Sequence, residues 1–192
     1  MNSEPRYRFQ RLDSAQARQA RTTVEDVYRR SYIDAIASGD PFDSPEQFMH
    51  RFDNYTSAAR DTGFSMIIAW VNGEPAGQTW GWVLEPNAAW WRNFQPDDAT
   101  LNVGAFTHED GTRTFALSEI MVCSEQTGRG LARALHDRLL SSRTERRATL
   151  LVEPDNLRAY RAYENWGWVR VGVTKPNWPN APVLDVLLRE LT

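Results

Sequence analysis

The chain has 192 residues, of which 41% are hydrophobic and 24% are charged, and its formal net charge at pH 7 is −3. This length and composition predict a single domain over residues 1–192 with one sizeable hydrophobic core. The slight negative charge argues against a general nucleic-acid partner, because phosphate backbones bind strongly basic surfaces.

Neither a membrane span nor a signal peptide is expected. No apolar run approaches the length that crosses a bilayer, and residues 1–7 are not a charged-then-apolar leader, so the expected location is the cytoplasm. The single cysteine, Cys123, excludes an internal disulfide and is expected to pack rather than to act as a nucleophile. His50, His108 and His136 have no metal-ligand spacing, so no metal is expected.

The N-terminal third is predicted to form a strand and two helices. Residues 7–12 alternate enough for a strand, and Asp13 or Ser14 can cap a helix that runs to about Ile36. After a Gly-Asp-Pro break, Ser44 begins the second helix. The aromatic stripe of this helix is expected in the core or, alternatively, partly along a ligand pocket; it consists of Phe48, Phe52 and Tyr55.

A β-hairpin and a long aromatic insertion follow. Residues 66–71 and 76–84 are predicted strands around an Asn-Gly-Glu-Pro turn, and Gly81 within the second strand predicts a bulge or a close backbone approach. Residues 86–113 have little periodicity but are rich in aromatic side chains. These side chains predict either part of a lid over a bound substrate or a hydrophobic cluster that covers the sheet; they include Trp90, Trp91 and Phe94.

The segment after residue 114 predicts a strand, a glycine turn and a helix. Residues 115–122 are β-branched and aromatic, and a helix is predicted over residues 131–141. Between them, Gly128 and Gly130 permit a tight turn whose backbone N–H groups converge at the helix start and can bind an anion, although a purely structural turn remains the alternative. A basic cluster is expected to be a solvated helix end; it consists of Arg143, Arg146 and Arg147.

A second motif follows about 24 residues after the glycine turn. It has Asn, then Ala three residues later, Tyr at seven, and Gly with an aromatic at eleven and twelve: Asn156, Ala159, Tyr163, Gly167 and Trp168. With the turn QTGRGLA, this spacing resembles the GNAT superfamily of acyl-CoA-dependent N-acyltransferases, over roughly residues 115–191. The resemblance implies an α/β (α+β) fold with a mixed, mostly antiparallel sheet of about seven strands, flanked by helices and splayed between strands four and five.

The resemblance also implies which residues bind acetyl-CoA or another acyl-CoA. Pantetheine would pair with the backbone of Ile120, Met121 and Val122, and Asn156 would hold the pantetheine arm while capping its helix. The pyrophosphate would bind the turn and helix start: Thr127, Gly128, Arg129, Gly130, Leu131, Ala132 and Arg133. Thr127 departs from the family pattern, which has Arg or Gln there, and Gln126 is displaced by one residue. Weaker or differently oriented pyrophosphate contacts are therefore expected.

Two residues are predicted to carry the proton transfers. Tyr163 corresponds to the residue that protonates the departing CoA sulfur in the family, with a buried packing tyrosine as the alternative. Glu119 is a candidate general base, because a carboxyl in an apolar strand has a raised pKa. In some family members the base lies where this chain has Ala116, so the alternatives for Glu119 are binding of a cationic acceptor and pairing with an arginine. His108 and Glu109 are weaker candidates.

The predicted function is acetyl transfer from acetyl-CoA to the primary amine of a small-molecule acceptor, by direct attack in a ternary complex. Alternatives are acetylation of a protein or peptide, and an acyl-CoA-binding module without turnover. The last two strands are predicted over residues 169–173 and 183–191, and Trp178 between them is a candidate for an acceptor or dimer contact, with simple packing as the alternative. A homodimer is compatible with the sequence.

Overall fold

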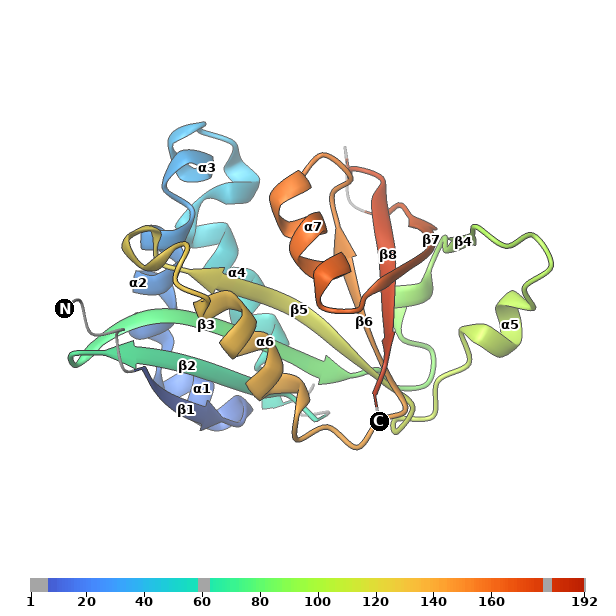
Figure 1. Ribbon diagram of the computed structural model, residues 1–192, viewed down its shortest axis with the longest axis horizontal. Coiled ribbons are helices and arrows are strands. Elements are labelled where there is room, and N and C mark those ends of the chain that lie inside the picture. The colour runs from blue at the N-terminus through green and yellow to red at the C-terminus, as the bar shows by residue number, and fades with distance from the viewer. Residues whose placement is uncertain (1–6, 59–62, 178–180, 192) are drawn as a thin grey trace. The chain divides into compact units, whose positions relative to one another are not determined.

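A computed structural model describes residues 7–58, 63–177 and 181–191. Within them, eight strands form one sheet in the order β1-β2-β3-β5-β6-β8-β7-β4 (Figure 1). The strands are β1 (Arg8–Leu12), β2 (Ser65–Val71), β3 (Glu74–Val83), β4 (Gln95–Pro96), β5 (Thr114–Val122), β6 (Arg147–Val152), β7 (Val169–Thr174) and β8 (Leu184–Glu190). The helices are α1 (Ser14–Gln19), α2 (Arg21–Ser31), α3 (Ile33–Ala37), α4 (Pro45–Tyr55), α5 (Val103–Phe106), α6 (Leu131–Leu140) and α7 (Leu157–Asn165). Short 3₁₀ turns are η1 (Pro41–Asp43), η3 (Ala89–Trp91) and η4 (Ser124–Gln126).

The predicted fold class, a mostly antiparallel mixed sheet flanked by helices, is confirmed. The eighth strand, β4, lies inside the insertion and pairs with β7 through two residues, too few to leave a periodic signal in the sequence. Strands β5 and β6 run parallel, and their ladder covers only Thr114–Ala116 against Arg147–Thr149. The ladder therefore ends early in β5, at the place where the sheet was predicted to open.

Contacts divide the chain into two units. The first contains Met1–Gly81 and Glu119–Ser142, and the second contains Trp82–Ser118 and Arg143–Thr192. Strand β5 contributes its first half to the second unit and its last four residues to the first. The prediction of a single domain stays a prediction. No helix in the part of the chain that the structure describes is long and apolar enough to cross a membrane.

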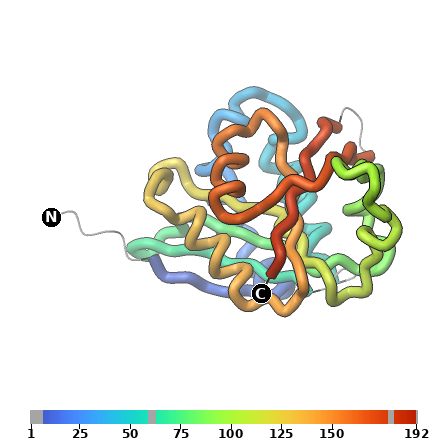
Figure 2. The backbone as a smooth tube through the Cα atoms, turned by 45° about the vertical axis from the view of Figure 1, so that its right-hand side comes forward, coloured from blue at the N-terminus to red at the C-terminus, as the bar shows by residue number. Residues whose placement is uncertain are grey.

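In the first unit, helices cover both faces of the β1-β2-β3 strands, which lie side by side in both views (Figures 1 and 2). Helix α6 packs on one face, where Leu131 and Leu135 approach Gly77. On the other face, the ring of Trp80 lies 5.9 Å from Phe48 and 5.4 Å from Phe52, both on α4. The aromatic stripe of α4 is therefore core at these two positions.

The single helix predicted to run to Ile36 is wrong, because the chain forms three helices there. Asp13 does cap α1: its carboxylate accepts from the backbone of Gln16 at 2.8 Å, and the Gln16 side chain accepts from the backbone of Asp13 at 3.0 Å. The helical path is interrupted at Ala20 (φ −87°, ψ 13°) and at Tyr32 (φ −111°, ψ 35°). The apolar spacing of the sequence thus continues through two points at which the backbone leaves the helical path.

The hairpin forms as predicted, but the bulge lies elsewhere. Asn72 and Gly73 both have positive φ, 52° and 88°, as a two-residue type I′ turn requires. Gly81 pairs in register with Ser65, and the register shift falls between Ala69 and Trp70 at the other end of the hairpin. Gly81 was chosen as the bulge site because it lies between two tryptophans. The sequence gives no signal for the register shift that occurs between Ala69 and Trp70.

The aromatic insertion packs as a hydrophobic cluster within the second unit. Trp91 and Phe94 are each only 8% exposed and pack with Leu84, Ala116 and Val186. Trp90 packs at the edge of this cluster, with its ring 6.3 Å from Trp82. This is the second of the two predicted interpretations, and a lid role for these aromatics remains a prediction. Trp178 lies outside the described residues.

The predicted solvated helix end is wrong for Arg147. Helix α6 ends at Leu140, and Arg147 begins β6 with its side chain buried. Its guanidinium donates to Thr114 Oγ1 at 2.8 Å, to the carbonyl of Phe106 at 2.7 Å and to Glu109 Oε1 at 3.1 Å. Glu109 also accepts from Trp91 Nε1 and Thr114 Oγ1, each at 2.8 Å. The prediction failed because Arg147 is buried beside the carboxylate of Glu109, a partner far away in the sequence.

This network predicts a large loss of stability in Glu109→Ala. Removing Glu109 leaves the buried Arg147 guanidinium without its counter-ion, which costs about 3–5 kcal/mol in the free energy of unfolding. As the matched control, Asp53→Ala breaks an exposed pair with Arg21 and is expected to cost about 0–1 kcal/mol. Urea denaturation of both variants measures the difference; equal losses would show that the buried pair adds no more than a surface pair.

Candidate functional site

Glu119 lies in the last part of β5, on the face of the sheet that α2 and α4 cover. Its side chain shares a face with Met121, two residues later. The sulfur of Met121 accepts from Gln78 Nε2 at 3.4 Å, and the same amide donates to the carbonyl of Val24 on α2 at 3.1 Å. Arg51 of α4 and Tyr28 of α2 are the groups that interact electrostatically with Glu119. The side chain of Glu119 therefore points toward the helices α2 and α4.

The carboxyl of Glu119 is half-buried and has no hydrogen bond or ion pair with the described residues. Burial raises its pKa to about 7, and the positive charge of Arg51 opposes that rise without cancelling it. The alternative in which Glu119 pairs with an arginine is therefore not found within residues 7–58, 63–177 and 181–191. A carboxyl with these properties can take up a proton near neutral pH.

The residues after Glu119 alternate between the two faces of β5. Ile120 and Val122 point to the opposite face from Glu119, and Met121 is buried. Close packing needs a glycine here: a Cβ on Gly77 would lie 2.7 Å from the carbonyl oxygen of Met121. The chain then continues through Cys123, whose N–H donates to the Ala76 carbonyl at 3.0 Å.

The turn that follows has the backbone that its glycines predict. Gly128 and Gly130 have φ of 79° and 75°, in the left-handed region that disfavours residues with a Cβ. Gly130 is the N-cap of α6 and provides no side-chain cap. The first N–H groups of α6, beginning at Leu131, therefore lack the usual side-chain acceptor, which is the arrangement that favours an anion.

The charged residues near the turn are partly engaged elsewhere. Arg129 is exposed, whereas Arg133 pairs with Asp137 at 2.7 Å one helical turn later. Glu125 is held by an ion pair with Arg30, which lowers its pKa against the effect of burial. Gln126, displaced by one from the family position, accepts from the Tyr7 hydroxyl at 3.0 Å. Arg133, Glu125 and Gln126 thus have partners within the protein, and the expectation of weaker or differently oriented pyrophosphate contacts stays a prediction.

The second motif forms α7 in the second unit. Asn156 is the N-cap, and its Oδ1 accepts from the N–H of Ala159 at 3.2 Å. Tyr163 is 8% exposed and lies edge-on to Trp166 and Trp168, with centroids 5.7 and 6.2 Å away. Gly167, with φ of 85°, ends the helix. Asn156, Tyr163, Gly167 and Trp168 thus have local structural roles, which are compatible with the predicted catalytic role of Tyr163.

Tyr160 differs from Tyr163 in the partner of its hydroxyl. It donates to Asp185 Oδ2 at 3.0 Å, and burial together with this carboxylate raises its pKa to about 12. Tyr160 is therefore committed to a structural hydrogen bond. Asn156 caps the N-terminus of α7 and Tyr163 lies within that helix, in the second unit. Glu119, the residues from Ile120 to Val122 and the glycine turn all belong to the first unit. The predicted roles of all these residues stay predictions.

Several weaker candidates have structural roles instead. Glu109 belongs to the buried network around Arg147, and His108 is exposed, with its carbonyl accepting from Arg113. Cys123 is fully buried, and burial raises the pKa of its thiol to about 11, which disfavours the nucleophilic thiolate. Among the described residues, no group of three or more His, Cys, Asp or Glu side chains could hold a metal ion.

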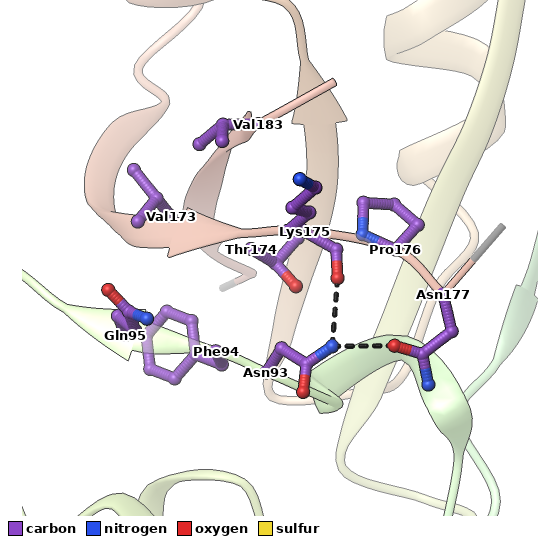
Figure 3. Close-up of a pocket in the computed structure, with 9 residues that line it drawn as sticks. All are labelled: Asn93, Phe94, Gln95, Val173, Thr174, Lys175, Pro176, Asn177 and Val183. Atoms are coloured by element: carbon purple, nitrogen blue, oxygen red, sulfur yellow. Dashed lines mark hydrogen bonds between the residues drawn. The ribbon is translucent and has the colours of Figure 1, made fainter. Parts of the chain in front are cut away.

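A cavity of about 890 Å³ lies in the second unit, and the sequence did not predict it. Asn93 links two segments of the lining, because its amide donates to the carbonyl of Lys175 at 2.9 Å and to Asn177 Oδ1 at 2.7 Å (Figure 3). Lys175 is the only lysine of the sequence. The cavity is lined by Asn93, Phe94, Gln95, Val173, Thr174, Lys175, Pro176, Asn177 and Val183.

Comparison with solved structures supports the fold. An acetyltransferase from Thermus thermophilus matches with a TM-score of 0.63 at 15% identity, over 96% of this chain and 97% of that one. The ribosomal-protein-S18-alanine N-acetyltransferase of Escherichia coli matches with 0.61 at 14% identity, over 97% and 95%. The PaiA N-acetyltransferase of Thermoplasma acidophilum, solved with coenzyme A, matches with 0.57 at 11% identity, over 96% and 99%.

These identities are low, so the likeness shows the fold alone. A search of curated protein sequences finds no match. The sequence does match the model of the acetyltransferase (GNAT) family, over residues 24–168, a range that contains both the glycine turn and the Asn156 to Trp168 motif. Because this range is most of the sequence and the fold agrees with it, the chain belongs to the GNAT family of acetyltransferases.

Proposed function

We propose that the protein transfers an acetyl group from acetyl-CoA to the primary amine of a small-molecule acceptor, by direct attack in a ternary complex. The observation that carries the proposal is the carboxyl of Glu119, which is half-buried, without a partner among the described residues, and has a pKa of about 7. Such a group suits the deprotonation of an amine near neutral pH. The cytoplasmic location is part of the same proposal.

The reaction follows from two proton transfers. Glu119 takes a proton from the amine, directly or through a water, as the nitrogen attacks the thioester carbonyl carbon. A backbone N–H of the segment from Ile120 to Val122 polarises the carbonyl oxygen. The C–N bond forms, the C–S bond breaks, and Tyr163 gives its proton to the departing thiolate. The enzyme regains its starting protonation when the proton on Glu119 leaves and Tyr163 is reprotonated.

Acyl-CoA binding is assigned to both motifs. The exposed turn from Thr127 to Gly130 and the start of α6, through Leu131, Ala132 and Arg133, receive the pyrophosphate on backbone N–H groups. The backbone of Ile120, Met121 and Val122 pairs with pantetheine, and Asn156 holds its arm. Coenzyme A in the Thermoplasma acidophilum neighbour supports the choice of donor, and the length of the acyl group is assigned as acetyl from the family.

Two alternatives remain for the acceptor and for turnover. The Escherichia coli neighbour is named for a protein acceptor, which is why acetylation of a protein or peptide stays the second candidate. The third candidate is an acyl-CoA-binding module without turnover. Purified protein with acetyl-CoA and a panel of small amines and peptides distinguishes them by release of free thiol. Tight CoA binding with no thiol above background hydrolysis would favour the module.

Tyr163→Phe tests the general acid. Losing the proton donor is expected to lower kcat by roughly 10- to 1000-fold while CoA binding is retained. Tyr160→Phe is the matched control, because its hydroxyl is bound to Asp185 and its loss is expected to leave kcat near the wild-type value. Thiol release under saturating acetyl-CoA measures both variants. Near-normal turnover in Tyr163→Phe would assign the proton to water or to Tyr160.

Glu119→Gln tests the base through the pH profile. In the wild type, kcat/KM is expected to rise with pH and to level off above about pH 7, where Glu119 is deprotonated. The variant is expected to lose that inflection and roughly 100- to 10,000-fold of the plateau rate. An unchanged inflection in the variant would assign it to another group.

A stability measurement provides an independent check on Glu119. Its pKa in the folded state, about 7, lies above its ordinary value of 4.5, so the unfolded state gives up the proton at lower pH. Wild-type stability from this group is therefore present below pH 4.5 and is lost as pH rises toward 7. Glu119→Gln cannot ionise, so its Tm is expected to exceed the wild-type Tm increasingly from about pH 5 to about pH 8. A constant difference would contradict the raised pKa.

Gly128→Ala and Gly130→Ala test the phosphate turn. A Cβ at φ of 79° or 75° costs about 1–2 kcal/mol per residue in backbone strain, which corresponds to roughly 5- to 30-fold in Kd if the turn must distort. Gly39→Ala is the matched control, since Gly39 has φ of 78° and similarly open surroundings but lies after α3. Calorimetric titration with CoA should show weaker binding only in the turn variants; equal Kd values in all three would exclude the turn.

A further inference from the structure

The cavity of the second unit is lined by two segments that are bound to each other. One is the end of β7 with the residues that follow it, and the other is the part of the insertion that leads into β4. Thr174 Oγ1 donates to the carbonyl of Arg92 at 2.8 Å. The amide of Asn93 donates to Lys175 and to Asn177 (Figure 3). These three hydrogen bonds join residues that are 82 or 84 positions apart in the sequence, and they fix the two segments together.

Two backbone features allow this close approach. Strand β4 pairs with β7, and a Cβ on Gly172 would lie 2.7 Å from Cε2 of Phe94 and 2.9 Å from Cα of Pro96. The absence of a side chain at this point of β7 lets the insertion lie against the strand. Asn93 has φ of 63°, in the left-handed region that asparagine enters more readily than most residues. Contacts within the protein therefore define the shape of the cavity.

Lys175 is the only charged side chain among the described residues that line the cavity. It is exposed and forms no ion pair with a carboxylate of the described residues. Two carboxylates lie beside β7, those of Asp97 and Asp185, but both pair with Arg170. The part of the chain that the structure describes therefore leaves the positive charge of Lys175 without a counter-ion, and the cavity favours an anion.

The rest of the lining combines amide groups with apolar side chains. Oδ1 of Asn177 is already bonded within the protein, so its amide nitrogen is the group that can donate to a ligand. The side chain of Gln95 is exposed and can donate as well. Val173, Pro176 and Val183 add apolar surface, and Val183 is 50% exposed. An ammonium group, amide donors and apolar carbons thus line the same space.

This lining favours one class of ligand. The volume, about 890 Å³, is within the range of about 300–1,000 Å³ that is typical of small-molecule sites. A cationic ligand would meet a like charge at Lys175, whereas a carboxylate or phosphate would accept charge-assisted hydrogen bonds from its ammonium group. An apolar body attached to that anion would lie against the valine and proline side chains.

We propose that this cavity is a binding site for a small anionic molecule, with the anion bound by Lys175 and an apolar body bound by Val173, Pro176 and Val183. The site is assigned to a ligand other than the amine acceptor, because its one charged residue is a cation. The proposal concerns binding alone, so it does not depend on acetyl transfer.

Acylation of amines tests the proposal at a single side chain. Lys175 is the only lysine of the sequence, so the acetyl ester of N-hydroxysuccinimide reacts there and at the N-terminal amine, which is the internal control. The ester attacks only neutral amines, and a bound anion both favours the charged form and covers the nitrogen. Three probes share one apolar body: para-tert-butylbenzoate, para-tert-butylphenyl phosphate and the neutral para-tert-butylbenzamide.

The expected result is protection by an anion. At a probe concentration of about 10 mM, at least one of the two anions is expected to slow acylation of Lys175 by roughly threefold or more, as a Kd of about 5 mM would give. The N-terminal amine should react at an unchanged rate, and the benzamide should give no protection. Peptide mass spectrometry measures both rates, and the two anions show whether the cavity prefers a carboxylate or a phosphate.

Variants assign the binding to the cavity. Calorimetric titration with the preferred anion is expected to show roughly fivefold or weaker binding in Lys175→Gln, and Lys175→Arg should retain most of the affinity because it keeps the charge. Asn93→Gly keeps access to positive φ but removes the amide that holds Lys175 and Asn177, so binding should weaken there too. Arg146→Gln removes another exposed cation of the second unit and is the matched control, with wild-type affinity expected.

The outcomes decide the proposal without reference to turnover. Protection by an anion but not by the benzamide, with weaker binding in Lys175→Gln, would support it. No protection by either anion, equal protection by the benzamide, or an equal loss of affinity in Arg146→Gln and Lys175→Gln would overturn it. Release of thiol from acetyl-CoA tests the proposed function separately, so either proposal can fail alone.

Discussion

A missing side chain at one position of β3 sets the geometry of the first unit. At Gly77 a Cβ would lie 2.7 Å from the carbonyl oxygen of Met121 and 3.1 Å from Leu135. Only a glycine therefore lets β3 approach β5 and α6 this closely. The contact is at Met121, which follows Glu119 by two residues in β5 and precedes the glycine turn. The proposed proton acceptor and the proposed phosphate site therefore lie on either side of this contact along the chain.

Two glutamates of this protein have opposite environments. Glu109 is fully buried and receives hydrogen bonds from Trp91, Thr114 and Arg147, so its charge is stabilised by donors. Glu119 is more accessible, yet it has no such donor among the described residues, and its pKa rises to about 7. Burial alone therefore does not describe the environment of a carboxyl group. These two differ in whether hydrogen-bond donors and a counter-ion accompany the carboxyl.

Aromatic residues form part of the hydrophobic core in both units. In the second unit, Trp91 and Phe94 form the core of a cluster under the insertion, and this explains why a long segment without periodicity is ordered. In the first unit, Tyr28 and Phe48 are each 2% exposed and stack on each other at 3.8 Å, and Phe48 also contacts Trp80 of β3. The abundance of aromatic residues in the sequence thus reflects core packing at these positions in both units.

The sequence by itself determined the family, the fold class, the hairpin turn, the positive-φ glycines and the cap at Asn156, because each depends on local chemistry or on a fixed spacing. The features that required the tertiary structure depend on partners far away in the chain. Arg147 resembles a surface cation until Glu109 is seen beside it. The breaks at Ala20 and Tyr32 were hidden because apolar spacing continues through them. Long-range pairing and its absence leave no periodic trace in a sequence, and only folding brings these charges together.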